Sequence, residues 1–461
     1  MLVGIDSRDG RRLHEQLEQS LRTAIRSGRL VPGSRLPSTR ELCAQLGISR
    51  GVVSAAYSQL AAEGYLVTRQ GARVRVSEAI RGAPVRPSAR SLASPFAYDL
   101  RPNPDVSRFP RHSWQRSLRD ATRRTAATAL ADLDPRGLPE LRDALATYLD
   151  RVRGTAADPE LLLVCAGFSQ GFSLFCRWLR GQGEHSIAVE EPGWHRHRLI
   201  AEQAGLEVQP IPVDAYGLDV GELEATDAVA VVLTPAHGFP TGAVLSPERR
   251  AALLEWAQHG NGVVVEDDYD AELRFDGGAV GALQGLAPEH VLYIGSASKR
   301  LAPGLRQGWM LMPSWLTWPL VSAKSVEDTG AEVLGQMALA DFISRGELDR
   351  HLRRMRLAYA ARRRTLLSCV TELLPGVEFG SDPAGVFELL RLPDSVEESS
   401  LLAGAAGRGV GLEGLSLHRA SDPDRGGLLV GYGAAPEPAL QAAMRLLARA
   451  FEEVGGQTTR I

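Results

Sequence analysis

The sequence predicts a mixed α/β protein with two domains: a small winged helix-turn-helix at the N-terminus and a larger domain built on a largely parallel β-sheet. Helical periodicity followed by a glycine-containing hairpin pattern occupies residues 11–76. From about residue 96, short apolar runs alternate with helical segments, which is typical of a buried parallel sheet covered by helices. The length of 461 residues also exceeds that of one ordinary domain.

Three helices are predicted in the N-terminal region. Leucine or isoleucine recurs at every fourth position within residues 11–27, which is typical of an amphipathic helix. Ser38 and Glu41 have the spacing of a capping box, so a second helix should begin at Ser38 and end near Gly47. A third helix is expected to follow its cap at Ser49.

A hairpin should complete this first domain. The short segments Tyr65–Val67 and Arg73–Val76 are predicted to be two strands joined by a glycine turn, and three helices followed by a hairpin form a winged helix. We therefore assign residues 1–78 to the winged helix-turn-helix. Residues 79–95 are rich in proline, alanine, serine and arginine, which indicates a linker, and residues 96–461 form the α/β domain.

The charge is unevenly distributed along the chain. Residues 1–80 contain 12 arginines and 7 acidic residues, a net charge of +5, whereas the remaining residues carry −8. A basic end on an acidic body favours a polyanionic partner for that end, and on a winged helix the partner is double-stranded DNA. A chance imbalance of charge remains the alternative on this observation alone.

The candidate DNA-binding residues follow from the geometry of the helix-turn-helix. The N-terminus of the second helix of the pair enters the major groove, which here places Ser49 and Arg50 near the bases. Cations and helix N-termini both favour phosphate, and the wing can approach the adjacent groove. The further residues expected at these contacts are Arg35, Ser38, Arg40, Arg69 and Arg73. Each arginine taken singly could instead be a solvated surface charge.

In the larger domain, the residues that follow each apolar run are the ones expected to bind a ligand. Ligands of such sheets lie beyond the carboxyl ends of the strands. The predicted strands are Leu161–Ala166, Ser186–Val189, Ala228–Leu233, Gly262–Val265 and Val291–Ile294.

Lysine is rare in this chain, and one of its two lysines follows a predicted strand. Only Lys299 and Lys324 are present among 52 basic residues, although the base composition of the gene could cause this bias. A deprotonated lysine can form a Schiff base with an aldehyde, whereas arginine does not under ordinary conditions. Around Lys299, the donors Ser296, Ser298 and Arg306 suit a phosphate group. Taken alone, this segment could instead be an ordinary loop.

An acidic segment follows the strand Gly262–Val265. Asp267 is the candidate carboxylate that keeps a pyridine nitrogen protonated, and Tyr269 could donate to a ring hydroxyl. The alternative is an acidic surface turn, and Asp268 and Asp270 could belong only to such a turn.

Three further strand ends carry candidate ligand contacts. Gly167, Phe168 and Ser169 lie between a strand and a helix, where backbone amides and hydroxyls form a phosphate cradle. Trp194 could stack on a flat ring or belong to the core. His237 could face the ligand or cap a turn.

The N-terminal segments Leu36–Leu42 and Leu46–Arg50 resemble the GntR family of winged-helix regulators. The five strand-end motifs, taken in order, resemble the fold-type I aminotransferases, which bind pyridoxal 5′-phosphate (PLP). The two resemblances combined identify the chain as similar to the MocR subgroup of GntR regulators, and they cover essentially its whole length.

This resemblance implies specific roles for the candidate residues. Lys299 would form the Schiff base with PLP, Asp267 would pair with the pyridine nitrogen, Tyr269 would contact the ring hydroxyl, and Trp194 would stack on the ring. Arg196 and Arg425 would hold the carboxylate of an effector, and Arg425 is the weaker assignment because Arg419 is nearby. The resemblance also implies a head-to-tail homodimer.

Some positions depart from the aminotransferase pattern. Asp132 replaces a tyrosine that helps hold the partner's cofactor phosphate, Gly238 replaces a glutamine, and Phe239 replaces an asparagine that contacts the ring hydroxyl. These changes argue against efficient transamination more than against cofactor binding. We therefore expect a regulator that senses PLP, an amine or an amino acid. The alternatives are an active aminotransferase with a DNA-binding tether and a regulator with a vestigial PLP site.

Composition also disfavours several classes of protein. No apolar run of about 18 residues is present, and the first residues lack the apolar region of a signal peptide, so a cytoplasmic protein without a membrane span is expected. The four cysteines form no CxxC pair, which favours reduced thiols over disulfides or a zinc site.

Overall fold

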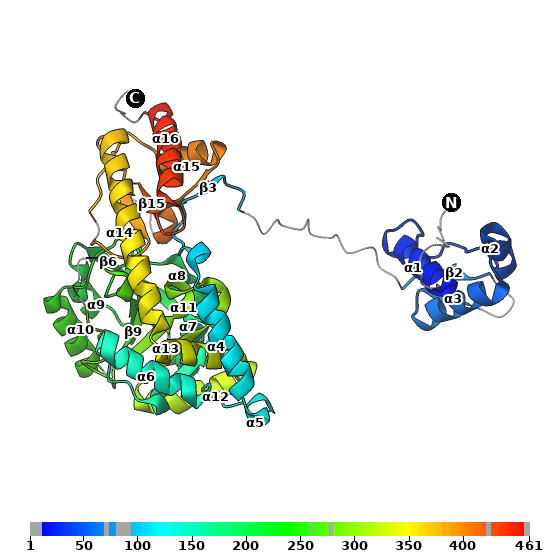
Figure 1. The fold of residues 1–461 in the computed structure, drawn as a ribbon, viewed down its shortest axis with the longest axis horizontal. Helices are drawn as coiled ribbons and strands as arrows, with labels where there is room; N and C mark the ends of the chain where they lie inside the picture. The colour runs from blue at the N-terminus through cyan, green and yellow to red at the C-terminus, as the bar shows by residue number, and fades with distance from the viewer. Residues whose placement is uncertain are drawn as a thin grey trace. The chain divides into compact units, whose positions relative to one another are not determined.

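The computed structural model describes residues 12–68, 73–79, 94–131, 133–260, 262–275, 278, 280–380, 382–420 and 426–455. The chain divides into two compact units, Met1–Ala93 and Ser94–Ile461 (Figure 1). Within the described ranges, no helix is both long and apolar enough to cross a membrane.

The first unit is a winged helix. It contains α1 (Leu13–Arg26), α2 (Thr39–Leu46) and α3 (Arg50–Ala62), followed by the antiparallel strands β1 (Leu66–Val67) and β2 (Arg75–Val76). The predicted fold of this region is confirmed. Its core is formed by apolar side chains from all five elements, including Leu17, Leu21, Val53, Leu60, Leu66 and Val76.

The helix boundaries in this unit follow from local capping. Ser38 accepts the N–H of Glu41, and the Glu41 carboxylate accepts the N–H of Ser38, so the predicted capping box is present. Gly47 ends α2 with a φ of 67°, a left-handed conformation that glycine adopts without strain. Ser49 precedes α3 as predicted, but its side chain forms no capping hydrogen bond, so that detail of the prediction is wrong.

The second unit is built on an eight-stranded sheet with the order β4-β11-β10-β9-β8-β5-β6-β7. Strands β10, β9, β8, β5 and β6 are parallel neighbours, whereas β11 and β7 pair antiparallel. The strands are β4 (Leu162–Cys165), β5 (Ser186–Glu191), β6 (Glu207–Asp214), β7 (Gly217–Leu218), β8 (Ala230–Leu233), β9 (Val263–Asp268), β10 (Val291–Ser296) and β11 (Gly308–Leu311).

Helices cover both faces of this sheet, which explains why β4, β8 and β10 are buried along their whole length, whereas β6, near one edge, is mostly exposed or partly buried. Strand residues that point to opposite faces of the sheet belong to different apolar clusters. Val265 and Ile294 pack in the cluster that includes α7 and α8, whereas Val264 and Val291 pack in the cluster that includes α10. Helices α4, α6 and α13 pack together, as Figure 1 shows. The helices are α4 (Arg111–Arg124), α5 (Ala127–Ala131), α6 (Pro139–Arg153), α7 (Phe168–Gly181), α8 (His195–Gln203), α9 (Val220–Glu224), α10 (Pro247–Gly260), α11 (Ala297–Arg300), α12 (Ser314–Asp328) and α13 (Val333–Ser344).

A long helix leads from this sheet into a second, smaller layer. Helix α14 packs on α13 and on α16, and the three-stranded sheet β12-β15-β14 lies in this part of the unit (Figure 1). A separate parallel pair joins β3 to β13. The elements are α14 (Glu347–Leu373), α15 (Glu398–Gly407), α16 (Glu437–Glu453), β3 (Tyr98–Asp99), β12 (Phe387–Arg391), β13 (Val410–Gly411), β14 (Glu413–Gly414) and β15 (Gly427–Gly431).

Candidate functional site

Lys299 lies in the short helix α11, directly after β10, at the edge where the parallel strands end. Its Nζ donates to the carbonyl oxygen of Pro102 at 2.6 Å, and its side chain is partly buried. Burial lowers the pKa of Lys299 below its ordinary value, because removal from water disfavours the charged ammonium. The neutral amine, which is the nucleophilic form, is therefore more populated than in an exposed lysine.

Lys324 is placed differently. It is fully buried in α12, and its Nζ pairs with Asp328 at 2.5 Å, one helical turn away. The ammonium charge of Lys324 is thus committed to a local ion pair, which leaves Lys299 as the lysine at the strand ends.

An anion cradle is present beside Lys299. Gly167 has a φ of 103°, and a Cβ added there would lie 3.8 Å from the Ser296 hydroxyl and from both terminal nitrogens of Arg306. The Ser296 hydroxyl in turn lies 2.8 Å from that of Ser298. Within the described ranges, Arg306 forms no ion pair. The turn therefore combines hydroxyl groups, an unengaged guanidinium and the N-terminus of α7, a donor set suited to a phosphate.

The remaining predicted cradle residues belong to the first turn of α7. Phe168 is buried and Ser169 is partly exposed. Helix α7 begins at Phe168, so both residues lie inside the helix and not between the strand and the helix as predicted. Glycine is also needed at position 308, because a Cβ there would lie 2.5 Å from the Gly167 Cα.

Asp267 is a buried carboxylate within β9, opposite Ile294 of β10. Its Oδ2 lies 3.0 Å from Nε2 of His197, a residue of α8 that the sequence analysis did not select. Burial raises the pKa of Asp267, and the hydrogen bond from His197 opposes that effect. The spacing in the sequence could have indicated His197. It follows Trp194 by three residues, which places both side chains on one face at the beginning of a helix.

Trp194 is partly buried and belongs to an aromatic cluster. Its ring lies edge-on to Phe168 at 5.8 Å and to His197 at 5.3 Å, measured between ring centroids. This cluster joins the anion cradle to the Asp267 carboxylate. Stacking of Trp194 on a ligand ring stays a prediction.

His237, Tyr269 and Asp270 form a buried hydrogen-bonded group. The Tyr269 hydroxyl lies 3.0 Å from Nδ1 of His237, and the same nitrogen lies 3.0 Å from the Asp270 carboxylate. Phe239 packs edge-on against Tyr269, with 6.2 Å between ring centroids. The backbone at Gly238 lies close to a neighbouring part of the turn, because a Cβ there would be 2.8 Å from the Ala243 carbonyl oxygen. Glutamine would therefore not fit at this position without movement of the turn.

The reading of Asp268 and Asp270 as a surface turn is wrong, because both are buried. Asp268 accepts hydrogen bonds from Arg153 at 2.6 Å and from Tyr293 at 2.5 Å. Burial alone would raise the pKa of Asp268, but the charges of Arg153 and Arg300 lower it to about 2. The cations that neutralise this carboxylate are distant in sequence, so the acidic run alone could not reveal its burial.

The predicted effector-binding residues are less fully described. Arg196 is exposed in the first turn of α8. Arg425 lies outside the described residues, as does Asp132. Arg419, the neighbour considered with Arg425, is partly buried, and its Nε has no hydrogen-bond partner among the described residues.

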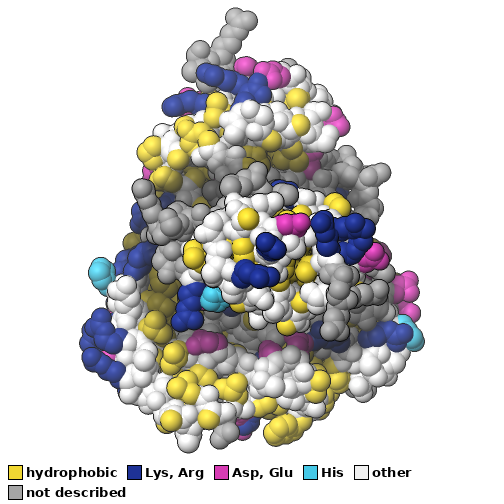
Figure 2. All heavy atoms as spheres, turned by 90° about the vertical axis from the view of Figure 1, so that its right-hand side faces the viewer, with side chains coloured by type: hydrophobic (Ala, Val, Ile, Leu, Met, Phe, Trp, Pro, Cys, Tyr) yellow, Lys and Arg dark blue, Asp and Glu magenta, His cyan; other side chains and the backbone are white. Residues whose placement is uncertain are grey.

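The predicted DNA-binding residues that the structure describes are exposed or partly exposed on the first unit. Ser49 and Arg50 are exposed at the start of α3, and within the described part of the chain the guanidinium groups of Arg35, Arg40 and Arg50 form no ion pair. Arg73 is 3.4 Å from Glu41, and Arg69 lies outside the described residues. Figure 2 shows exposed basic side chains, in the dark blue that marks both arginine and lysine, on the face in view.

Comparison with known proteins defines the class. The family model "Aminotransferase class I and II" matches residues 109–405, and "Bacterial regulatory proteins, gntR family" matches residues 13–76. The kynurenine aminotransferase of Pyrococcus horikoshii has the same fold, with a TM-score of 0.71 and 25% identity over 78% of this chain and 92% of that chain. The predicted fold class is confirmed, and with it the expected type of cofactor, PLP.

The chain resembles regulators over nearly its whole length. The pyridoxine biosynthesis regulator PdxR of Corynebacterium glutamicum is 31% identical over 92% of this chain and 93% of its own. The probable rhizopine catabolism regulator MocR of Rhizobium meliloti is 32% identical over 95% and 94%. The chain therefore belongs to the helix-turn-helix regulators that join a gntR-type domain to an aminotransferase-like domain, the MocR subgroup.

Proposed function

We propose that this chain is a cytoplasmic, homodimeric transcription regulator that binds an operator through its winged helix and responds to PLP, or to an amine or amino acid joined to it, at Lys299. The observation that carries this proposal is the amine of Lys299 beside a group of phosphate-binding donors, in a chain that is similar to regulators over nearly its whole length. Bound there, PLP supplies an aldehyde that condenses with primary amines.

Each group around Lys299 has a role in this proposal. Gly167, Ser296 and Arg306 bind the phosphate, and Asp267, supported by His197, holds a proton at the pyridine nitrogen. Arg196 and Arg425 hold an effector carboxylate. An effector alters DNA binding only if it favours one arrangement of the two domains over another.

A sensing role is favoured over turnover by the surroundings of Tyr269. Phe239 contributes an aromatic ring there and no side-chain hydrogen bond, and the Tyr269 hydroxyl already contacts His237. The chain should therefore bind amines through PLP without sustained transfer of the amino group. Turnover of an amino donor with a keto acid, at rates typical of aminotransferases, would contradict this proposal.

The attachment site is tested with the chain's two lysines. After loading with PLP and reduction with borohydride, peptide mass mapping should find the pyridoxyl group on Lys299. Lys299→Ala should abolish the label and the effect of PLP on DNA binding, while basal DNA binding remains. Lys324→Met is the matched control and should keep both. A label on Lys324, or an unaltered PLP response in Lys299→Ala, would refute the assignment.

The DNA interface is tested by binding at fixed salt, because salt strongly shifts such affinities. Arg50→Ala should weaken operator binding at least tenfold and relax sequence preference, since it removes a contact expected at the bases. Arg35→Ala should weaken operator and non-operator DNA alike. Arg29→Ala removes an exposed charge of the same unit outside the predicted interface and should change little. Equal effects of Arg50→Ala and Arg29→Ala would contradict the interface.

A further inference from the structure

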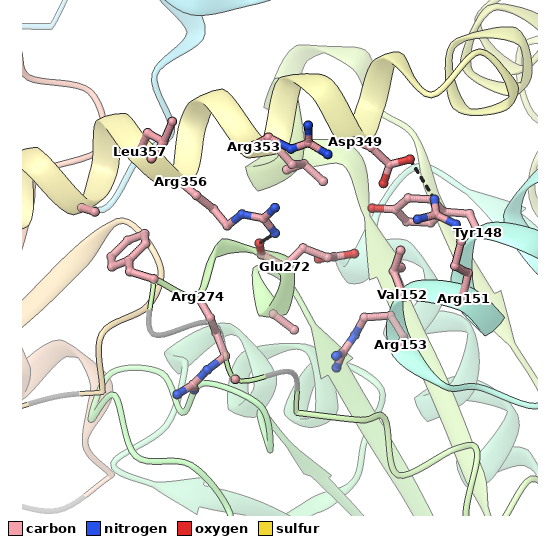
Figure 3. Close-up of a pocket in the computed structure, with 15 residues that line it drawn as sticks. Tyr148, Arg151, Val152, Arg153, Glu272, Arg274, Asp349, Arg353, Arg356 and Leu357 are labelled. Atoms are coloured by element: carbon pink, nitrogen blue, oxygen red, sulfur yellow. Dashed lines mark hydrogen bonds and ion pairs between the residues drawn. The ribbon is translucent and has the colours of Figure 1, made fainter.

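A cavity of about 680 Å³ lies in the larger unit between α6, the segment that follows β9, and α14. Five arginines line it, against two carboxylates, Glu272 and Asp349. Figure 3 shows Arg356 of α14 and Arg153 of α6 entering the cavity from opposite sides, with Glu272 between them. The five are Arg151, Arg153, Arg274, Arg353 and Arg356.

Both carboxylates of the cavity are already engaged. Asp349 pairs with Arg151 at 2.8 Å, and Glu272 pairs at 2.7 Å with Arg300, which does not line the cavity. In contrast, neither Arg353 nor Arg356 pairs with a carboxylate in the part of the chain that the structure describes, and Nη1 of Arg356 donates only to the Glu272 carbonyl oxygen at 3.1 Å. The cavity therefore holds an excess of positive charge.

The floor of the cavity contains buried donors without partners. Arg153 is 3% exposed; its Nε binds Asp268 and its Nη1 binds the Val280 carbonyl, but its Nη2 has no hydrogen-bond partner among the described residues. The Tyr148 hydroxyl, on a side chain 2% exposed, also lacks one. Both residues line the cavity, and an acceptor oxygen that reached these two donors would satisfy them.

We propose that this cavity binds a small organic anion with two or more phosphate or carboxylate groups, separately from the Lys299 site. Guanidinium groups are suited to such oxyanions, and the apolar side chains of Val152, Leu352 and Leu357 provide contact for a carbon framework. The volume is that of a small-molecule site. Arg153 is too deeply buried to meet the phosphate backbone of a duplex.

The cavity is joined to the Lys299 site by buried ion pairs. Arg153 binds Asp268, which directly follows Asp267, and Arg300, which directly follows Lys299, binds both Asp268 and Glu272. An anion that engages Arg153 acts on the same charges that fix the end of β9 and helix α11. Binding at the two sites is therefore linked, and each ligand should alter the affinity of the other.

The test is calorimetric titration of the full-length, PLP-loaded protein with inorganic pyrophosphate at fixed salt. We expect one saturable site per chain, weakened at least tenfold by Arg353→Gln or Arg356→Gln. Arg354→Gln is the matched control, because it removes the same charge from the same helix outside the cavity. It should leave the affinity unchanged.

Three results would overturn the proposal. The first is the absence of saturable pyrophosphate binding to the wild-type protein, and the second is an equal loss of pyrophosphate affinity in Arg354→Gln. The third is a loss of DNA affinity in Arg356→Gln without any change in pyrophosphate binding. That third result would show that these arginines bind nucleic acid. Lys299→Ala should still bind pyrophosphate. Saturable pyrophosphate binding in this variant, even with an affinity altered by the linkage, separates this site from the proposed cofactor site.

Discussion

At the scale of single residues, Glu190 shows how burial controls protonation in this domain. It lies on β5, is 5% exposed, and its Oε2 accepts the N–H of Thr234 at 3.0 Å and the hydroxyl of Thr234 at 2.7 Å. Burial raises the pKa of Glu190 to about 8. The folded protein therefore keeps a proton on Glu190 at neutral pH, where the unfolded chain has lost it.

The consequence is a loss of stability with rising pH. Between the ordinary glutamate pKa and about pH 8, the folded state binds one more proton than the unfolded state. The free energy of unfolding therefore falls by up to about 1.4 kcal/mol per pH unit from this group. Glu190→Gln should remove that slope, so its thermal midpoint should fall less between pH 6 and pH 8 than that of the wild type.

The control is Glu207→Gln, the same change at an exposed position of the adjacent strand β6. It should retain the wild-type slope. If Glu190→Gln and Glu207→Gln both follow the wild-type pH dependence, Glu190 is ionised in the folded protein and the argument fails.

Which site residues could be predicted depended on where their partners lie in the chain. Lys299 followed from its rarity and from its place after an apolar run. His197 and Arg153 could not be found in this way, because they contact Asp267 and Asp268 from 70 and 115 positions away. Long-range pairing of this kind is decided by the sheet order, which local patterns do not encode.

At the scale of secondary-structure elements, Ser38 has two separable roles. Its hydroxyl oxygen caps α2, and the same residue is proposed to meet a DNA phosphate. Ser38→Ala should lower stability by about 1 kcal/mol through loss of the cap. Ser38→Asp should keep the cap, because a carboxylate also accepts the Glu41 N–H, but repel phosphate and weaken DNA binding at least as strongly.

Thermal denaturation and DNA binding at fixed salt measure the two effects of these variants. Thr39→Ala is a suitable control, since it changes the next residue without removing the capping oxygen. Full DNA affinity in Ser38→Asp would show that Ser38 is remote from the phosphates.

Element boundaries were predictable wherever a local signal sets them. The capping box at Ser38 and the glycine at position 47 define α2, and the structure has both. Strand β9 extends to Asp268, beyond the predicted end at Val265. Arg153 neutralises the Asp268 carboxylate and Tyr293 donates a hydrogen bond to it, so this carboxylate can lie within a buried strand. The sequence pattern could not supply those partners.

At the scale of the whole molecule, the two units have separate cores. The apolar cluster of the winged helix draws only on residues between Leu17 and Val76, and the clusters of the larger unit begin at Tyr98. Each core is built from its own elements, so the units are expected to unfold in separate transitions rather than in one.

Ligand binding should then move only one of those transitions. PLP that binds the folded larger unit stabilises it by about 2.7 kcal/mol at a hundredfold excess over its Kd, while the winged helix gains nothing. Differential scanning calorimetry of the full chain should show one transition raised by PLP and one unchanged. Lys299→Ala should reduce the shift and Lys324→Met should preserve it. A single transition, or two that shift together, would contradict this expectation, because either result would show that the two units are thermodynamically coupled.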